Sequence, residues 1–431
     1  MNLISDHNKL PYMLYADRTG QIYEHPYFRM TGFSGSETII PLEEDLVPLS
    51  EFSKLFFLPD CPPIGLDPCT GTWEIVSEID IDGASISCYA VAAFLEPGFV
   101  RSLLPAVDYQ NKTYRLPMWA YTAVGSKDDR YWAAAFRIED NSRWNPQNYD
   151  DRELIPAIDD YLNEQSPGPL TNHLINCATK NHCFAAKNLF LKRWEAPMPV
   201  SRSCNAACLG CISLQCDDEC TASHQRLLFR PSQAEIVDLA VRHLQEASDG
   251  IISFGQGCEG EPLTEYKLIA SSIKEIRKAT IKGTININTN GSWPDRVEEI
   301  AASGLDSIRI SLNSARPDLY HAYYRPVNYH FEDVVFSIKK AREIGLFTML
   351  NYLVFPGITD QPEELNALKE LIENTGVNFI HFKNLNIDPQ YYLENMPGHS
   401  TEAMGMIKCY EMLKKDFPKL QLGYFNQAIR K

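Results

Sequence analysis

From residue 194 onwards, short apolar runs alternate with amphipathic segments in a regular order. The apolar runs have the length of buried strands, and the segments between them carry the apolar period of helices. Six strand–helix units in succession predict an α/β fold, a partial (β/α)6 TIM-like barrel built on a parallel sheet. The predicted strands cover residues 197–200, 250–255, 283–290, 307–313, 347–355 and 379–385, and the predicted helices cover residues 232–247, 263–278, 293–302, 331–344 and 362–375.

Three of the predicted strands carry polar side chains on the face turned away from the helices. Side chains alternate between the two faces of a strand, so apolar residues such as Ile285 and Ile287 pack against helices while their neighbours face inward. A barrel packed only for stability would carry Val, Ile and Leu inside. The polar residues predict a ligand cavity, with a self-satisfied hydrogen-bond network as the alternative. The candidate pocket residues are Asn286, Asn288, Arg309, His381 and Lys383.

A cysteine-rich segment, RSCNAACLGCISLQCDDEC at residues 202–220, directly follows the first predicted strand and holds five of the twelve cysteines. Its first three, Cys204, Cys208 and Cys211, have the spacing C-x3-C-x2-C. Thiolates this close on one loop are typical metal ligands, and three of them leave one coordination position open for chemistry. In parallel α/β folds the working groups lie at the carboxyl ends of strands, where this loop is expected.

The remaining cysteines of this segment, Cys216 and Cys220, have no assigned role. They form a possible second metal or redox site, as ligands of another iron–sulfur cluster or of zinc, as a redox thiol, or as residues without a function. Cys177 and Cys183 are possible partners. Their offset of six residues does not place them on one helix face, so a site shared by these two requires a break in the predicted helix at 171–192.

The chain before the alternating region divides into two parts. Residues 1–165 are interpreted as a strand-rich accessory domain of mixed structure, because aromatic and β-branched runs are separated there by Gly, Pro and Asp. Residues 166–193 form a helical connector after the break SPGPL, residues 194–388 the barrel, and residues 389–431 a helical tail. Cys61 and Cys69 flank a proline-rich loop in the first domain and are interpreted as ordinary residues.

Charge and composition limit the partners and the compartment. The formal net charge of −16 disfavours nucleic acid, since phosphate binding requires clustered Lys and Arg. The first twenty residues lack the pattern of a signal peptide, and no apolar run reaches the ~18 residues of a membrane span. Twelve cysteines in such a chain indicate a reducing compartment and metal ligation. We therefore expect a cytoplasmic protein without a membrane partner.

The segment 194–388 resembles the radical SAM superfamily, and its layout is closest to the molybdopterin-biosynthesis and peptide-maturase types. The resemblance implies a [4Fe–4S] cluster on Cys204, Cys208 and Cys211, with S-adenosylmethionine (SAM) bound through its amino and carboxylate groups to the fourth iron. It also implies one-electron cleavage of SAM to methionine and a 5′-deoxyadenosyl radical that removes hydrogen from a substrate. An electron donor such as flavodoxin or ferredoxin, and sensitivity to oxygen, follow from the same resemblance.

Four further motifs support the resemblance, each at the carboxyl end of a predicted strand. They read GQGCEGEPL, INTNG, SLNS and LVFPGITD in chain order. The resemblance assigns them to successive parts of SAM. The matched residues are Gly260 and Glu261 for the methionine ammonium, Thr289 and Asn290 as further SAM contacts, Ser311 and Asn313 for the ribose, and Val354 to Gly357 for the adenine.

Two positions depart from the family pattern. The residue before the third cysteine is usually aromatic and lies against the adenine, but here it is Gly210. In the Gly-Gly-Glu motif the first glycine is replaced by Glu259, which predicts an additional charge beside the ammonium site. His224 lies near the cysteine loop in sequence and is either a polar core residue or a site residue. No residue is assigned as the catalytic group that reacts with substrate.

The sequence therefore predicts a radical SAM enzyme. A small metabolite or cofactor precursor is the favoured substrate, followed by a peptide or protein and then by RNA; a cobalamin-dependent methyltransferase is disfavoured because no cobalamin module is found. The alternative from another class is a non-catalytic structural zinc protein. These two differ in colour and metal content, since a four-iron cluster makes a protein brown whereas zinc leaves it colourless.

Overall fold

The computed structural model of the chain describes residues 7–164, 166–215, 220–398 and 402–430. The chain divides into two compact units, each built from several segments. The first unit comprises Met1–Asn141, Leu353–Lys369 and Phe382–Tyr424, and the second comprises Ser142–Tyr352, Glu370–His381 and Phe425–Lys431. The domain limits given by the sequence stay a prediction. Among the described residues, none of the helices combines the length and apolar character needed to cross a membrane.

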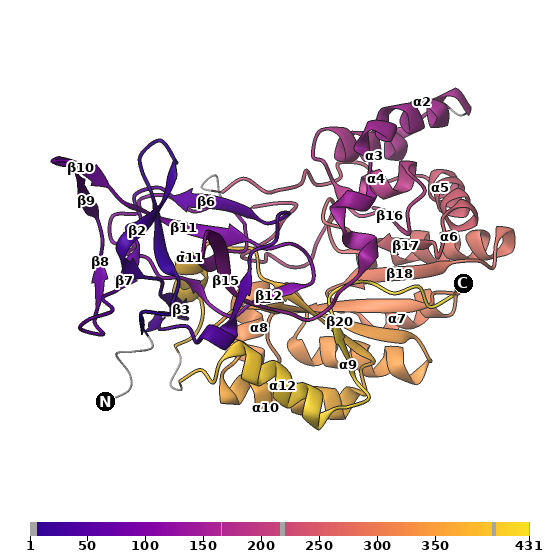
Figure 1. Cartoon of the computed structure of the whole chain (residues 1–431). Coiled ribbons are helices and arrows are strands. Elements are labelled where there is room, and N and C mark those ends of the chain that lie inside the picture. Colours follow the sequence, from indigo (N-terminus) through magenta and orange to yellow (C-terminus); the bar gives the residue numbers. More distant parts are fainter. Residues whose placement is uncertain (1–6, 165, 216–219, 399–401, 431) are drawn as a thin grey trace. The chain divides into compact units, whose positions relative to one another are not determined.

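The first unit is dominated by an antiparallel sheet, drawn in indigo and purple in Figure 1. Its main path runs β12-β15-β14-β11-β1-β2-β7-β8, and β5 and β6 pair beside it. Alanine, valine and leucine side chains from β1, β11, β14 and β15 form its main apolar core. Two smaller sheets of this unit have the strand orders β10-β9 and β13-β3-β4. The strands of the first unit up to residue 137 are β1 (Tyr12–Ala16), β2 (Ile22–Arg29), β3 (Gly32–Ser34), β4 (Glu37–Ile39), β5 (Leu46–Pro48), β6 (Lys54–Leu58), β7 (Ile64–Leu66), β8 (Trp73–Ile75), β9 (Glu78–Ile81), β10 (Ala84–Ser87), β11 (Tyr89–Phe94), β12 (Phe99–Arg101), β13 (Leu104–Pro105), β14 (Thr122–Lys127) and β15 (Arg130–Arg137).

A parallel sheet forms the centre of the second unit. The strand order is β16-β17-β18-β19-β20-β21-β22, and the pairs from β16 to β20 are parallel. The alternation of strands and helices thus gives the predicted α/β sheet, whereas its curvature into a partial barrel stays a prediction. The strands are β16 (Glu195–Pro197), β17 (Ile251–Phe254), β18 (Thr284–Thr289), β19 (Ser307–Leu312), β20 (Phe347–Val354), β21 (Phe379–Asn384) and β22 (Gln421–Gly423).

The helices between these strands follow the sequence signals closely. Helix α5 begins with a capping box of Ser232 and Glu235. Helix α10 begins at Pro362, and the Asp360 carboxylate just before it accepts from the Gly357 N–H at 2.7 Å. The helices are α5 (Gln233–Glu246), α6 (Tyr266–Ala279), α7 (Pro294–Ala301), α8 (Pro317–Tyr324), α9 (Phe331–Glu343), α10 (Pro362–Thr375), α11 (Pro389–Asn395) and α12 (Met406–Asp416).

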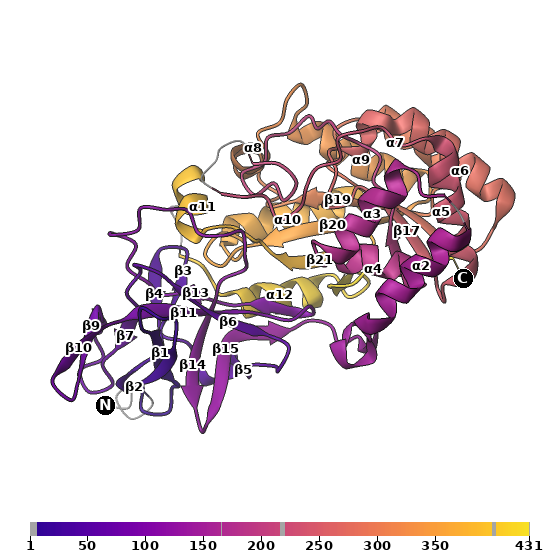
Figure 2. The ribbon, with the colours of Figure 1, turned by 90° about the horizontal axis from the view of Figure 1, so that it is seen from above.

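Three helices precede the parallel sheet and lie together, as Figure 2 shows in magenta. They are α2 (Leu154–Glu164), α3 (Pro169–Thr179) and α4 (Phe184–Phe190). The helix predicted at 171–192 is broken between α3 and α4, where His182 has a φ of 50° and Cys183 becomes the first residue of the α4 turn. The start of α3 is fixed to α5, because the Glu235 carboxylate accepts from the Leu170 N–H at 3.1 Å.

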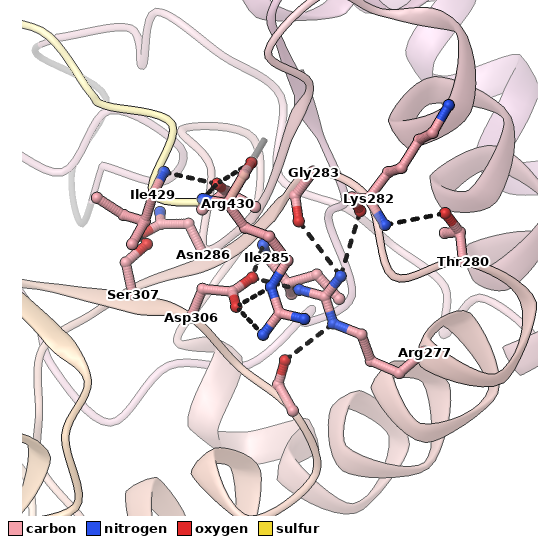
Figure 3. A network of polar contacts seen from close by, with 12 residues as sticks. Arg277, Thr280, Lys282, Gly283, Ile285, Asn286, Asp306, Ser307, Ile429 and Arg430 are labelled. Atoms are coloured by element: carbon pink, nitrogen blue, oxygen red, sulfur yellow. Dashed lines mark hydrogen bonds and ion pairs between the residues drawn. The ribbon is translucent and has the colours of Figure 1, made fainter.

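The amino ends of β18 and β19 are joined by an ion-pair network around Asp306 (Figure 3). Arg277 from α6 and Arg430 near the carboxyl terminus both pair with the Asp306 carboxylate, which also accepts from the Ile285 N–H at 2.8 Å. Arg277 further donates to the carbonyls of Gly304 and Gly283 at 3.1 and 3.2 Å. These contacts hold the helix, two strands and the terminal segment together. In parallel α/β folds this end of the strands contributes to stability, not to chemistry.

Candidate functional site

The loop after β16 carries the three predicted metal ligands, Cys204, Cys208 and Cys211, all of them half-buried. Backbone hydrogen bonds attach this loop to the carboxyl end of α8. The Ala207 and Leu209 N–H groups donate to the carbonyls of Tyr324 and Tyr323 at 3.1 and 2.9 Å. A loop fixed in this way has its backbone polar groups satisfied, so its thiols are presented in a defined arrangement.

A cluster of tyrosines supports this loop from α8 and the turn after it. Tyr320 stacks on Tyr324 with ring centroids 4.6 Å apart, and the hydroxyls of Tyr320 and Tyr329 lie 3.1 Å apart. All three rings are buried. Sequence reasoning missed both α8 and this cluster, although the aromatic run HAYYRPVNY was a possible signal.

The surroundings of the three thiols combine burial with one nearby guanidinium group. Burial raises the pKa of Cys204 to about 11, so this thiol is neutral until a metal replaces its proton. The Arg226 guanidinium, also missed by sequence reasoning, lies 3.4 Å from the Cys211 sulfur and donates to the Ser213 hydroxyl at 3.0 Å. Three thiols with an adjacent fixed cation fit the anionic sulfur shell of an iron–sulfur cluster.

The loop after β17 packs tightly against the residues just before Cys204. The Gly260 N–H donates to the Ser201 carbonyl and the Glu261 N–H donates to the Ser203 carbonyl, both at 2.8 Å. A Cβ atom on Gly260 would lie 2.0 Å from the Ser203 carbonyl oxygen, so only glycine fits there. This contact brings the predicted ammonium-binding residues, Gly260 and Glu261, next to the cysteine loop.

Glu261 is buried and held by neutral donors from the end of β18. Its carboxylate accepts from the Thr289 hydroxyl at 2.5 Å and from the Asn290 N–H at 2.8 Å. Burial raises the pKa of Glu261 to about 7. The structure therefore brings three of the predicted SAM residues together. Asn290 also donates to the Asn205 side chain at 2.8 Å, which joins β18 to the residue after Cys204.

Glu259, at the unusual position of the Gly-Gly-Glu motif, has a different surrounding from the one predicted. Both of its carboxylate oxygens accept backbone N–H groups: Val200 and Ser201 at 2.8 and 2.9 Å, and Gly255 and Gln256 at 2.6 and 2.9 Å. Burial raises its pKa to about 7. The carboxylate predicted to add a charge beside the ammonium site is therefore hydrogen-bonded to four backbone N–H groups. Through these bonds Glu259 connects the segments that follow β16 and β17.

The predicted pocket residues of β18 and β19 fall into two groups. Asn286 is fully satisfied, because it bonds the side chains of Ser253, Asn288 and Ser307 at 3.1, 2.9 and 2.9 Å. For this residue the self-satisfied network describes the structure. Arg309 differs: its Nε atom is buried without a hydrogen-bond partner among the described residues, and the nearest opposite charge that acts on it is Glu195.

The other predicted positions are buried or lie in tight turns. Asn313 donates to the Leu319 carbonyl at 3.1 Å, which anchors the start of α8, and Ser311 is half-buried on β19. His381 is buried beside Phe379, with ring centroids 4.2 Å apart. In the first unit, the Lys383 ammonium lies 3.3 Å from the centre of the Tyr424 ring.

The predicted adenine segment also lies in the first unit. Val354 is fully buried, and Gly357 has a φ of 87°, a conformation that favours glycine. A Cβ atom on Gly357 would lie 1.9 Å from the Gly35 nitrogen, so this turn also needs glycine for the close approach of two backbones. The assignments of Ser311, Asn313, Val354 and Gly357 to SAM stay predictions.

The possible second cysteine site differs from the one predicted. Cys216 lies outside the described residues. Cys220 is buried, and its thiol contacts the Thr221 carbonyl at 3.8 Å. Cys177 instead lies with His173 and Cys258, and sequence reasoning did not consider Cys258 as a metal ligand. Cys183 is not part of this group, although its N–H donates to the Cys177 carbonyl at 2.9 Å.

Comparison with known proteins shows what the segment that carries this site is similar to. Residues 198–372 match the model of the radical SAM superfamily. The chain is 26% identical over 219 residues to the FeMo cofactor biosynthesis protein NifB of Rhizobium meliloti (strain 1021), covering 46% of this chain and 42% of the relative. It is also 26% identical over 197 residues to a probable GTP 3′,8-cyclase of Methanosarcina acetivorans, covering 44% of this chain and 54% of the relative. The chain thus spans about half the length of these curated relatives.

Solved structures of radical SAM proteins resemble the chain more distantly. Streptococcus suis SuiB bound to S-adenosylmethionine has a TM-score of 0.39 and 13% identity, covering 73% of this chain and 71% of that one. The [FeFe]-hydrogenase maturase HydG has a TM-score of 0.38 and 14% identity, covering 65% and 64%. The family match covers the cysteine loop, Glu261 and the strands that position them. Residues 198–372 are therefore similar to a radical SAM domain.

Proposed function

We propose that the protein cleaves SAM reductively at Cys204, Cys208 and Cys211 and removes hydrogen from a small metabolite or a cofactor precursor. The observation that carries this proposal is the contact between the Glu261 loop and the cysteine loop, through the Gly260 and Glu261 N–H groups. When bound, a [4Fe–4S] cluster supplies the single electron that breaks the carbon–sulfur bond of SAM, leaving methionine and the 5′-deoxyadenosyl radical.

The residues of the chain bind and orient the reactants. Glu261 receives the methionine ammonium of SAM, and its orientation is fixed by Thr289 and Asn290. A buried carboxylate that is hydrogen-bonded only to neutral groups is stabilised strongly by a cationic ligand. The ligand supplies the opposite charge that the carboxylate lacks in the unliganded chain. The Arg226 guanidinium contacts the Cys211 sulfur and the Ser213 hydroxyl, and its positive charge offsets the negative charge of the Cys211 thiolate.

The Arg309 side chain favours the proposal that the substrate is small and acidic. The Arg309 Nε atom is buried without a hydrogen-bond partner among the described residues, and a carboxylate or phosphate would satisfy it with a bidentate contact. The names of the two relatives, a cofactor biosynthesis protein and a probable nucleotide cyclase, also favour small-molecule chemistry. A peptide substrate remains the second proposal, and a flavodoxin or ferredoxin is the proposed electron donor.

The proposal is tested by anaerobic reconstitution of the full chain with iron and sulfide, followed by addition of SAM and dithionite. We expect about four irons per chain on the triad and formation of 5′-deoxyadenosine. A chain that binds the irons but forms no 5′-deoxyadenosine under any reducing condition would contradict the proposal. For the substrate class, pools of acidic metabolites and of peptides are compared as stimulants of 5′-deoxyadenosine formation, and Arg309→Gln is expected to reduce the stimulation by acidic metabolites alone.

A further inference from the structure

A second group of metal-ligating side chains lies between α3 and the loop after β17. His173 and Cys177 are four residues apart on α3, so their side chains share one face of the helix. Cys258 comes from the loop that carries Glu259, Gly260 and Glu261. One ligand atom from each of His173, Cys177 and Cys258 lies within 4.8 Å of the other two. Among the described residues, the Cys204–Cys208–Cys211 triad is not part of such a compact group.

The spacing of these three atoms suits a single ion. The His173 Nε2 and Cys177 sulfur atoms are 3.5 Å apart. Bonds of about 2.3 Å to sulfur and about 2.0 Å to nitrogen place the ligand atoms of a tetrahedral zinc ion roughly 3.5–3.8 Å apart. A four-iron cluster binds each cysteine through a different iron, so its ligand sulfurs lie farther apart. The group is therefore built for one metal ion, not for a cluster.

The surroundings of the group support metal binding. Cys177 and Cys258 are 2% and 4% exposed, so neither thiol is open to solvent chemistry. Hydrogen bonding to the Cys258 thiol and to His173 lowers the pKa of Cys177 to about 5, while that of Cys258 is raised. The His224 imidazole acts electrostatically on Cys177.

We propose that His173, Cys177 and Cys258 bind one zinc-type divalent ion that fastens α3 to the loop presenting Gly260 and Glu261. The amino end of α3 is already fixed to α5 by Glu235. An ion at Cys177 fixes the carboxyl half of the helix as well, and it binds the loop only three residues before Glu261. Metal binding releases the protons of the Cys177 and Cys258 thiols, as coordination by cysteine requires. The site is separate from the triad and does not depend on SAM chemistry.

The test removes the triad first, so that metal in the second site is measured alone. The full chain carrying Cys204→Ala, Cys208→Ala and Cys211→Ala is purified and its metals are measured by inductively coupled plasma mass spectrometry. We expect about one zinc per chain. Adding Cys177→Ser or His173→Ala to this background is expected to remove it. Cys61→Ser, at a buried thiol of the first unit, is the matched control and should retain the zinc.

A second measurement protects the test against variants that fail to fold. Co²⁺ is added to the metal-stripped triple-alanine chain, whose His173, Cys177 and Cys258 are intact, and thiolate-to-cobalt absorption is recorded. One equivalent of tightly bound Co²⁺ with this absorption, displaced by Zn²⁺, supports the proposal. No stoichiometric metal, zinc that survives Cys177→Ser, or an iron–sulfur spectrum from the triple-alanine chain would each overturn it. None of these results depends on whether the wild-type chain cleaves SAM.

Discussion

The two ends of the parallel sheet each bury a carboxylate, but they balance its charge differently. At the amino ends of β18 and β19, Asp306 pairs with two guanidinium groups, Arg277 and Arg430. At the carboxyl ends, Glu261 accepts only neutral hydrogen bonds in its contacts with Thr289, Asn290 and Leu263, and no salt bridge among the described residues includes it. The first carboxylate is paired with cationic side chains, whereas the second is hydrogen-bonded to neutral groups.

This difference explains why one buried acid stabilises the fold and the other fits a binding site. Isolated buried charges are costly, and proteins retain them where they are paired or where a ligand pairs them. Burial raises the pKa of Glu261 to about 7. Asp306, in contrast, forms ion pairs with Arg277 and Arg430 of the same unit. The following predictions test this contrast from the largest expected effect to the smallest.

The largest effect is expected for Cys208→Ala, which removes one of the three triad thiols. Iron content should fall to background and 5′-deoxyadenosine formation should cease, because two thiols cannot hold the cluster with one iron open to SAM. Iron analysis and chromatography of the products measure both quantities. The control is Cys61→Ala, which should keep both. A Cys208→Ala chain with full activity would show that the triad is misassigned.

At the amino end of the strands, Asp306→Ala leaves the largely buried guanidinium of Arg277 and the more exposed guanidinium of Arg430 without their carboxylate. We expect the free energy of unfolding to fall by about 3–5 kcal/mol, the typical effect of removing one partner of a buried ion pair. Urea unfolding followed by circular dichroism gives this value. The exposed pair Lys340–Glu298 provides the control, since Glu298→Gln should change stability by about 0–1 kcal/mol. Equal effects of the two substitutions would refute the structural role of Asp306.

At the carboxyl ends, Glu261→Gln keeps the shape of the side chain but removes its charge. SAM affinity of the cluster-loaded chain should fall roughly 10- to 100-fold, the equivalent of one charged hydrogen bond. Equilibrium dialysis with labelled SAM measures it. Glu259→Gln is the matched control: its amide group cannot accept two backbone N–H bonds on each side, so stability should fall while the folded chain still binds SAM. If Glu259→Gln weakened SAM binding more than Glu261→Gln, the two roles would be reversed.

The pH dependence of SAM binding follows from the raised pKa of Glu261. Below about pH 7 the carboxyl group is protonated and no longer attracts an ammonium, so SAM affinity should decrease by up to about tenfold per pH unit. The unliganded chain should show the opposite trend for this group. Its pKa is above the ordinary value of 4.5, so its contribution to stability is lost as the pH rises from 4.5 to about 7. Affinity that is constant from pH 6 to pH 8 would contradict this assignment.

The smallest effect is expected for Thr289→Val, which removes the hydroxyl that orients Glu261 but keeps the shape. A neutral hydrogen bond contributes about 1 kcal/mol, so the Michaelis constant for SAM should rise roughly fivefold with the turnover number nearly unchanged. Steady-state kinetics separate the two parameters. A loss confined to the turnover number would indicate that Thr289 acts in the chemical step instead of positioning Glu261.

The sequence predicted what depends on local pattern. The predicted strand at 283–290 and the predicted helix at 362–375 agree with β18 and α10 closely, because strands and helices have distinct apolar periods. The grouping of Gly260, Glu261 and Thr289 followed from a general rule for parallel sheets, in which carboxyl ends of strands meet at one edge. Both predictions needed no knowledge of tertiary contacts.

The structure added what depends on contacts between distant residues. Cys258 had been considered only as part of the Gly-Gly-Glu segment, and its neighbour Cys177 is about eighty residues earlier in the chain. Arg226 carries no pattern that would assign it to Cys211. Glu259 was predicted to add a charge beside the ammonium site, and its four backbone donors could not be predicted because they come from turns whose geometry no propensity specifies. Such partners are set by packing, not by periodicity.

The central claim is that the carboxyl ends of the strands bind SAM for cleavage while the amino ends only stabilise the fold. One measurement tests it most directly: 5′-deoxyadenosine formed per folded, cluster-loaded chain by wild type, Glu261→Gln and Asp306→Ala at limiting SAM. We predict that Asp306→Ala matches wild type and that Glu261→Gln forms roughly 10- to 100-fold less product. Full activity of Glu261→Gln together with loss of activity in Asp306→Ala would contradict the claim.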